Sequence, residues 1–438
     1  MSVGQAVTTY ARQTRWFFLR ISLFWFGLSF IWGGMNIQIL PWRIDRFVRD
    51  GLVPEEIKGT ALGALVFVGL VVAIVVQPVA GAISDRATLR WGRRRPFMAA
   101  GVAASIPFLI FVGVAPNYGW LFVALVLLQI GANIAHGPYQ GVIPDQVAPA
   151  KRGQASGFLG LANFVGTLAG AGVAGAWLSE GHLLPAMLTI VAVLSLSSLV
   201  TWRVVKESRA PAMPPFGGVM REFSQRLREL GARPAFVWLM LSRLFFFMGL
   251  QAMDNFLQFF FRDGLIEPDL EIDIFGFVFD LGPEFKTTGV LAVVLVLAVL
   301  TAVPGGWVAD RYGKLRVVAV AASLGVLSAA LMMTAQSFVQ VLGYAVFLGI
   351  GVGLFTAADW AVAIDLIPDP RAPGLYMGLS NVATAGGDAL ATVSAGIALD
   401  LVGFRGVFAM MGIFFGITLL VLIGVREALA RTDVSVTA

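Results

Sequence analysis

Twelve long apolar runs divide this sequence, and they constrain its fold more than any other feature. Each run has about 20 residues or more, the length that an α-helix needs to cross the hydrocarbon core of a bilayer. Lipid offers no hydrogen-bond partners to the backbone, so a spanning segment must pair its own polar groups, as a helix does. The runs lie near residues 17–40, 59–83, 96–115, 119–143, 155–178, 184–204, 235–261, 287–309, 316–335, 337–364, 375–400 and 404–425.

The composition supports a membrane protein and excludes a soluble one. The 438 residues are 58% hydrophobic and only 13% charged, whereas soluble domains have about 45–50% and about 25%. The first run follows Arg12 and Arg15 and is longer than the apolar core of a signal peptide. We therefore predict an all-α membrane protein with twelve transmembrane helices and a retained first span.

Several classes of chemistry are excluded by what the chain lacks. It has no cysteine and only two histidines, His136 and His182, so we expect no disulfide, no metal site and no cofactor. No phosphate-binding loop for ATP is present, and no nucleophile, base and orienting residue can be grouped as an enzyme site. The sequence predicts neither an ATPase nor a membrane enzyme.

The positions of the basic residues predict the orientation in the membrane. Most of the 31 Lys and Arg residues fall on one side if the N-terminus is placed in the cytoplasm, and cytoplasmic loops are the ones enriched in these residues. We expect a multi-pass protein of the cell (inner) membrane with both termini cytoplasmic. The net charge of +5 then reflects this asymmetry of the loops, and we predict no nucleic-acid partner.

The sequence also contains an internal repeat. Gly81, Asp85 and Arg86 return as Gly306, Asp310 and Arg311, an offset of 225 residues. A second landmark, an Ile-Pro-Asp triplet before a Gly-Leu-x-Asn segment, recurs in the same order at nearly the same offset. We predict an N-terminal six-helix bundle in 1–204, a C-terminal one in 235–438, and a cytoplasmic linker in 205–234 whose apolar residues have the spacing of an amphipathic surface helix.

The repeated motif resembles the signature of the major facilitator superfamily, and the resemblance covers the whole chain. The segment from Ser84 to Phe97 is similar to the longer variant found in sucrose–proton symporters and the related glycoside-pentoside-hexuronide transporters, as is Asn133 to Pro138. The resemblance implies two pseudo-symmetric six-helix bundles, a monomer, a central cavity lined by helices 1, 4, 7 and 10, and secondary active transport.

The resemblance also implies a gating role for the motif, as a charge network that stabilises the outward-open form and breaks when the halves rock. Its small and acidic residues would allow close helix approach and accept bonds from a neighbouring helix terminus. The other interpretation is that the basic cluster only sets topology. The residues concerned are Gly81, Asp85, Arg86, Gly92, Arg93, Arg94, Gly306, Asp310, Arg311 and Gly313.

Polar residues at helical spacing within the spans predict the transport path, because polar groups are costly in lipid and usually face a cavity. Such stripes occur in the first, fourth, seventh and eleventh runs. Amide and hydroxyl groups suit a polyhydroxyl solute, and a tryptophan can stack on a sugar ring or simply pack. The substrate-binding candidates are Trp32, Asn36, Gln129, Asn133, His136, Gln251, Asn255 and Trp360.

Four charged residues within the spans are candidates for ion coupling: Arg243, Asp254, Asp359 and Asp388. Arg243 needs a partner on another helix, and both Asp359 and Asp388 fit; it could also extend toward the membrane surface. Asp359 could lie in a wet vestibule, and Asp254 and Asp388 could form interhelical bonds. The second run has no aspartate at its middle of the kind sodium-linked melibiose carriers use, so we predict proton coupling.

The sequence thus favours a proton-coupled transporter of a small polar solute, a sugar or glycoside, in a lipid bilayer. An exporter of amphipathic compounds, or a receptor or assembly factor that transports nothing, remains open because fold does not fix function. The acidic segment 263–284 between the seventh and eighth runs is interpreted either as a lid or as a solvated loop.

Overall fold

The computed structural model describes residues 14–87, 89, 91–148, 151–205, 234–265, 270–274, 277–366 and 373–430. Within these residues twelve helices are long and apolar enough to cross a membrane, which confirms the predicted fold class. The predicted linker lies almost wholly outside the described residues.

Each half of the chain supplies six of the spans. In the first half they are α1 (Arg15–Gly34) continued by η1 (Met35–Ile39) and α2 (Leu40–Arg49), α3 (Lys58–Arg86), α4 (Arg95–Val114), α5 (Tyr118–Gln140), α7 (Arg152–Ser179) and α8 (Leu183–Val204), with the short α6 (Val142–Gln146) between α5 and α7. In the second half they are α10 (Pro234–Asp254) continued by α11 (Leu257–Phe259) and η5 (Phe260–Gly264), α12 (Pro283–Tyr312), α13 (Lys314–Met332), α14 (Phe338–Asp365), α15 (Pro373–Val402) and α16 (Phe404–Ala430).

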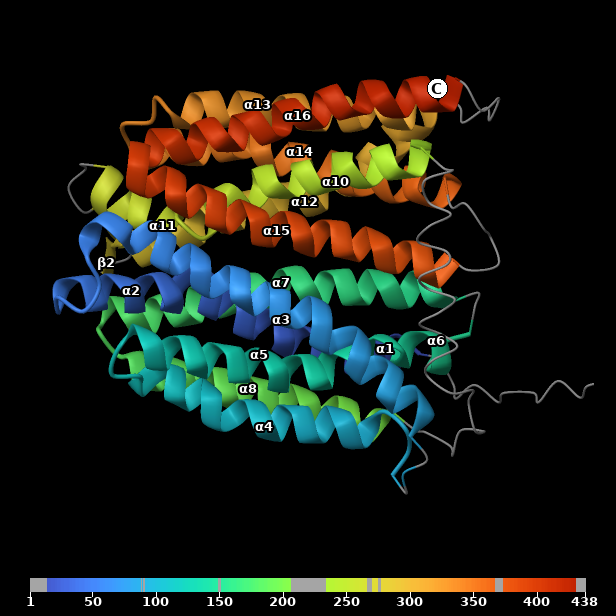
Figure 1. Cartoon of the computed structure of the whole chain (residues 1–438), viewed down its shortest axis with the longest axis horizontal. Coiled ribbons are helices and arrows are strands. Elements are labelled where there is room, and N and C mark those ends of the chain that lie inside the picture. The colour runs from blue at the N-terminus through green and yellow to red at the C-terminus, as the bar shows by residue number, and fades with distance from the viewer. Residues whose placement is uncertain are drawn as a thin grey trace, which may run out of the picture.

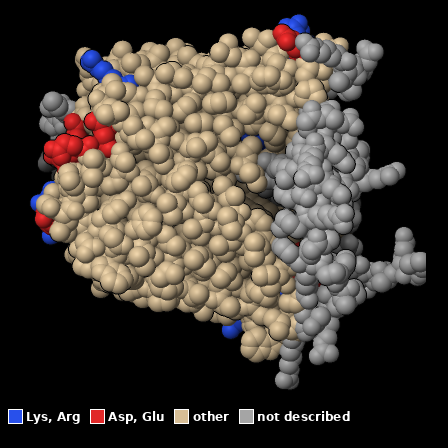
Figure 2. All heavy atoms as spheres, in the orientation of Figure 1, with Lys and Arg blue, Asp and Glu red and all other residues tan. Residues whose placement is uncertain are grey.

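The helices lie side by side, so the molecule has two ends (Figure 1). We call the end where α3 and α12 finish the motif end, because it holds both copies of the repeated motif. We call the opposite end the hairpin end, because it holds the antiparallel strands β1 (Leu270–Ile274) and β2 (Phe277–Leu281). On the face shown in Figure 2 most of the charged side chains lie toward the edges and few lie in the broad middle, as a lipid-facing belt requires.

Helices of one half pack mainly on helices of the same half. In the first half α1 packs on α7 and α8, and α5 on α3 and α4; in the second, α10 packs on α15 and α16, and α14 on α12 and α13. Two pairs cross between the halves, α3 with α15 and α7 with α12. These two pairs of long helices form most of the contact between the halves among the described residues, which is an arrangement in which one half can tilt against the other.

The first and seventh spans share a backbone irregularity that the sequence analysis did not predict. Both contain a π-helical segment, Met35–Ile39 in one and Phe260–Gly264 in the other, and the offset between them is the same 225 residues that relates the two motifs. The seventh span also breaks after Asp254. Since π-segments in helices often mark functional sites, these two spans are the first place to look for one.

The first span is longer than predicted. The apolar run ends near Leu40, but helix continues to Arg49 because its charged residues find partners: the Arg43 guanidinium donates to the Ala115 carbonyl and lies 4.5 Å from the Phe47 ring. The strands β1 and β2 form within the segment interpreted as a loop, where acidic and apolar residues alternate along β1 as a strand requires.

Candidate transport site

The two halves touch at the hairpin end and separate toward the motif end. On α7, Gly172 and Gly175 lie against Thr288 and Glu284 of α12. The same face of α7, about three to four turns nearer the motif end, carries Leu161, which is 52% exposed. Along α12 the corresponding face ends in Val303, which is 68% exposed, and in Gly306, which has open space beside it.

The second pair of crossing helices, α3 and α15, shows the same gradient. At the hairpin end the backbones are so close that a Cβ on Gly396 would lie 2.4 Å from the carbonyl oxygen of Gly59. Further along α15 nothing lies within 4 Å of a Cβ placed on Gly386. The structure is therefore closed between the halves at the hairpin end and open toward the motif end, where Figure 2 shows the surface hollowed between them.

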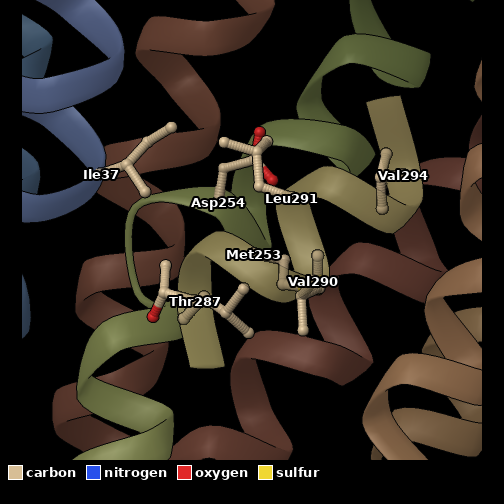
Figure 3. Close-up of a pocket in the computed structure, with 8 residues that line it drawn as sticks. Ile37, Met253, Asp254, Thr287, Val290, Leu291 and Val294 are labelled. Atoms are coloured by element: carbon tan, nitrogen blue, oxygen red, sulfur yellow. The ribbon is translucent and has the colours of Figure 1, made fainter. Parts of the chain in front are cut away.

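A small cavity of about 10 Å³, close to the space that a single water molecule needs, lies below the closed end (Figure 3). Its wall combines Ile37 of the π-segment in the first half with residues of α10, α11 and α12 from the second. Asp254 is the charged residue in a lining that is otherwise apolar apart from Thr287. Among the described residues no hydrogen bond or ion pair reaches the Asp254 carboxylate, which leaves it available to a proton or a ligand.

Asp388 carries a second carboxylate that no hydrogen bond or ion pair reaches among the described residues. It lies in α15, and its Oδ1 is buried without a hydrogen-bond partner among the described residues. The helix that carries Asp388 packs against α10, the helix that ends at Asp254.

The structure selects Asp359 as the partner of Arg243. Arg243 is 3% exposed and Asp359 is 1% exposed. The Nη1 atom of Arg243 lies 2.7 Å from the Oδ2 atom of Asp359. Arg243 also donates from Nε to the Thr384 hydroxyl at 3.0 Å. The pair and its bond to Thr384 join α10, α14 and α15. Asp359 is buried, so it does not lie in the wet vestibule considered from the sequence.

The polar stripe of the fourth span lies in α5, inside the first half. Asn133 donates to the Gln129 side chain at 3.0 Å, and both residues are buried. The His136 ring packs edge-on against Trp25 with centroids 4.9 Å apart, and its Nε2 has no hydrogen-bond partner among the described residues. Gln129, Asn133 and His136 thus lie along one helix, and His136 contacts Trp25, which was not among the predicted substrate-binding residues.

The other substrate-binding candidates are placed separately. Trp32 and Asn36 are partly buried in the first span, and Gln251 is partly buried in α10. Asn255 is fully buried and donates to the Thr392 hydroxyl at 3.1 Å, so it joins two helices of one half. The side chain of Trp360 lies outside the described residues.

The first copy of the gating motif forms a charge network at the motif end. Arg94 lies 3.0 Å from the Asp85 carboxylate and 2.7 Å from that of Asp145, which Arg93 also contacts. Arg94 further donates to the Pro138 carbonyl at 2.8 Å. All these partners belong to the first half. The side chain of Arg86 lies outside the described residues.

The second copy of the motif is exposed. Asp310 and Arg311 face the outside, and among the described residues Asp310 has neither an ion pair nor a hydrogen bond. Gly92 and Gly313, which open α4 and α13, both have a positive φ, 101° and 99°, a conformation that favours glycine. Gly81 packs against Gly137, whereas Gly306 faces open space, so close helix approach explains one glycine of the repeat and not the other.

The contacts that join the halves use residues the sequence analysis did not select. They are polar or charged residues at the hairpin end, and no local pattern predicts which of them pair. Glu284 was placed in a solvated loop, but it is 6% exposed at the start of α12. The set comprises Gln38, Asp45, Lys58, Arg262, Asp263, Glu284 and Asp400.

The chain belongs to the family of MFS/sugar transport proteins, whose model matches residues 38–424. This places it in the major facilitator superfamily.

Its curated relatives are carriers of sugars. The chain is 33% identical over 115 residues to the sucrose transport protein SUC4 of Arabidopsis thaliana, a match that covers 22% of each protein. It is 27% identical over 176 residues to SUC3 of the same plant, covering 32% of this chain and 30% of that protein. A general alpha-glucoside permease of Schizosaccharomyces pombe is 28% identical over 123 residues, covering 23% and 22%. The matches thus span less than a third of these relatives.

Solved structures share the fold over nearly the whole chain. The nucleoside transporter NupG superposes with a TM-score of 0.68 at 13% identity, covering 94% of this chain and 98% of that one. A bacterial homolog of the human lysosomal transporter Spinster, in an inward-facing and unoccupied conformation, gives a TM-score of 0.66 at 15% identity and 96% coverage of both. At these identities the likeness establishes the architecture alone.

Proposed function

We propose that this protein is a secondary active carrier that moves a sugar or glycoside by alternating access and is driven by a proton gradient. In this proposal the motif end and both termini face the cytoplasm, as the distribution of Lys and Arg favours. The structure then corresponds to a carrier closed to the outside and open to the inside.

One observation carries the proposal: among the described residues the carboxylates of Asp254 and Asp388 have no partner, and Asp254 lines a cavity between the halves below a closed end. A carrier that couples to protons needs a group that changes its protonation when the site faces the other side. Arg243 and Asp359 satisfy each other, so we assign proton binding to Asp254 and Asp388 and keep the buried ion pair as their support. The apolar lining of the Asp254 cavity favours the neutral carboxyl.

The solute is proposed from the chemistry of the first half and from the relatives. Gln129 and Asn133 present amides and His136 an unpaired ring nitrogen, groups that exchange hydrogen bonds well with sugar hydroxyls. Trp32, Asn36, Gln251 and Trp360 remain proposed contacts of the solute. The sucrose and glucoside carriers among the relatives support this class of solute.

The proposal also assigns the moving parts. The halves 1–204 and 235–438 would tilt as units, with 205–234 as their connection, since most helix packing lies within a half. The carrier would act as a monomer, because the solute site and the contacts between halves are formed within one chain.

Flux into proteoliposomes tests this function. We expect radiolabelled sucrose or maltose to accumulate when the outside is more acidic than the inside, and we expect Asp254→Asn and Asp388→Asn to abolish this accumulation while exchange across equal pH persists. Glu180→Gln is the matched control, since Glu180 is exposed and, among the described residues, pairs with His182 alone. A flux that does not change when a pH gradient is imposed would contradict proton coupling.

A second candidate is export of amphipathic compounds, which the apolar wall around Asp254 favours. The same vesicles distinguish it. An exporter would move a lipophilic cation and leave sucrose and maltose outside, whereas the proposed sugar carrier would do the reverse.

A further inference from the structure

The hairpin end is held shut by ion pairs that cross between the halves. Arg262 of η5 lies 2.6 Å from the carboxylate of Asp45 in α2, and Lys58 at the start of α3 lies 2.7 Å from the carboxylate of Asp263. In each case one partner belongs to the first half and the other to the second. The same end is joined by neutral bonds from Gln38 to the Glu284 carbonyl and the Thr288 hydroxyl.

Three of these four charged residues also have a second partner within their own half. Asp45 lies 2.7 Å from Arg49, Arg262 lies 3.4 Å from Glu284, and Lys58 lies 3.3 Å from Glu55. If the halves separate, Asp45, Arg262 and Lys58 each keep an opposite charge. The usual penalty for breaking a buried ion pair, an uncompensated charge, is thereby avoided for them.

The fourth charge, Asp263, lies at an exposed position where water replaces the lost partner. Asp400 completes the closed end, because its carboxylate accepts hydrogen bonds from the backbone N–H groups of Gly59 and Thr60 at 2.8 and 2.7 Å. These groups form the N-terminus of α3, which attracts a negative charge. If this contact breaks, the Asp400 carboxylate is likewise not left as an unpaired charge in an apolar environment.

These contacts lie directly above the Asp254 cavity. Gln38 follows Ile37, which forms the first half's part of the cavity wall, and Glu284 lies one turn before Thr287 of the same wall. Separating Asp45 from Arg262 therefore exposes this cavity to the hairpin side.

We propose that Arg262 and Lys58 form an exchangeable ionic gate, which closes the hairpin end by pairing with Asp45 and Asp263 and opens by returning to the partners of their own halves. A fixed structural bridge would have no use for this second set of partners. The gate rests on the proposed alternating access, but not on the identity of the solute or on proton coupling.

The absence of native cysteine makes a direct test possible. A single cysteine introduced by Ile37→Cys reports access to the cavity, and a membrane-impermeant maleimide added to intact cells reports access from outside only. We expect Arg262→Gln and Lys58→Gln each to raise the labelling rate about fivefold, since each removes a crossing pair of moderate strength. Arg405→Gln removes a charge from the same end without touching the interface and should leave the rate unchanged.

A second variant makes the test two-sided. Arg49→Gln removes only the alternative partner of Asp45, so the gate predicts slower labelling, whereas a general loosening of this end predicts faster labelling. In the double variant Asp45→Asn with Arg262→Gln the rate should match that of Arg262→Gln alone. Equal rates in all variants, or faster labelling with Arg49→Gln, would overturn the gate.

Two controls separate failure of the gate from other failures. Leu52→Cys lies exposed at the hairpin end and must label rapidly in intact cells, which tests the orientation. Sucrose flux measured on the same variants tests the proposed function. If the labelling rates change as expected but no flux is seen, the gate is supported and only the proposed carrier function is contradicted.

Discussion

At the scale of residues, the buried charges of the spans are of two kinds. Arg243 and Asp359 neutralise each other and share a further bond with Thr384. Asp254 and Asp388 have no such partner among the described residues. Four residues that look equivalent in the sequence thus divide into a pair that fixes three helices together and a pair that is free to bind a proton.

This division predicts how stability responds to substitution. Arg243→Met or Asp359→Leu alone leaves an unpaired buried charge and should cost about 3–5 kcal/mol of stability, whereas the double substitution should cost much less. Thermal unfolding of the purified variants, followed by intrinsic tryptophan fluorescence, measures this. Additive losses in the double variant would contradict a self-contained ion pair.

At the scale of elements, close contacts between backbones at the hairpin end depend on small residues. α3 and α15 meet where Gly59 faces Gly396, and α7 meets α12 at Gly172 and Gly175. Nearer the motif end the same helices diverge. The contact between α3 and α15 therefore has no space for even one methyl group at one end and ample space at the other.

Two glycines of α15 give a matched test of this contact. Gly396→Ala would bring a methyl group to within 2.4 Å of the Gly59 carbonyl oxygen, whereas Gly386→Ala meets nothing within 4 Å. Because both changes raise helix propensity equally, only the first should increase maleimide labelling at Ile37→Cys. Equal labelling of the two variants would show that this contact does not hold the hairpin end closed.

The sequence predicts the elements well and the contacts between them poorly. The spans and the repeated motif are visible because each depends on a local run or spacing. Partner choice depends on the arrangement in space: Arg243 could not be assigned to Asp359 over Asp388, and Glu284, which appeared to lie in a solvated loop, is buried against Gln258 and Arg262. The π-segments escaped prediction because no residue pattern marks them.

At the scale of the whole molecule, the two ends differ in the way that alternating access requires. The halves are joined by crossing ion pairs and close backbone contacts at the hairpin end, and at the motif end Arg94 pairs with Asp85 and Asp145 of its own half. Between the two ends lie the free carboxylates and the polar stripe of α5. A carrier needs a second state in which the halves are separated at the hairpin end and joined at the motif end.

Distances between spin labels at both ends test this central claim most directly. Labels at Leu52 and Leu401 report the hairpin end, and labels at Trp91 and Trp307 report the motif end, all at exposed positions. In lipid nanodiscs at acidic pH with sucrose, and separately in the Arg262→Gln variant, we predict that the hairpin-end distance lengthens while the motif-end distance shortens. Distances that stay fixed, or that lengthen at both ends together, would contradict alternating access in this protein.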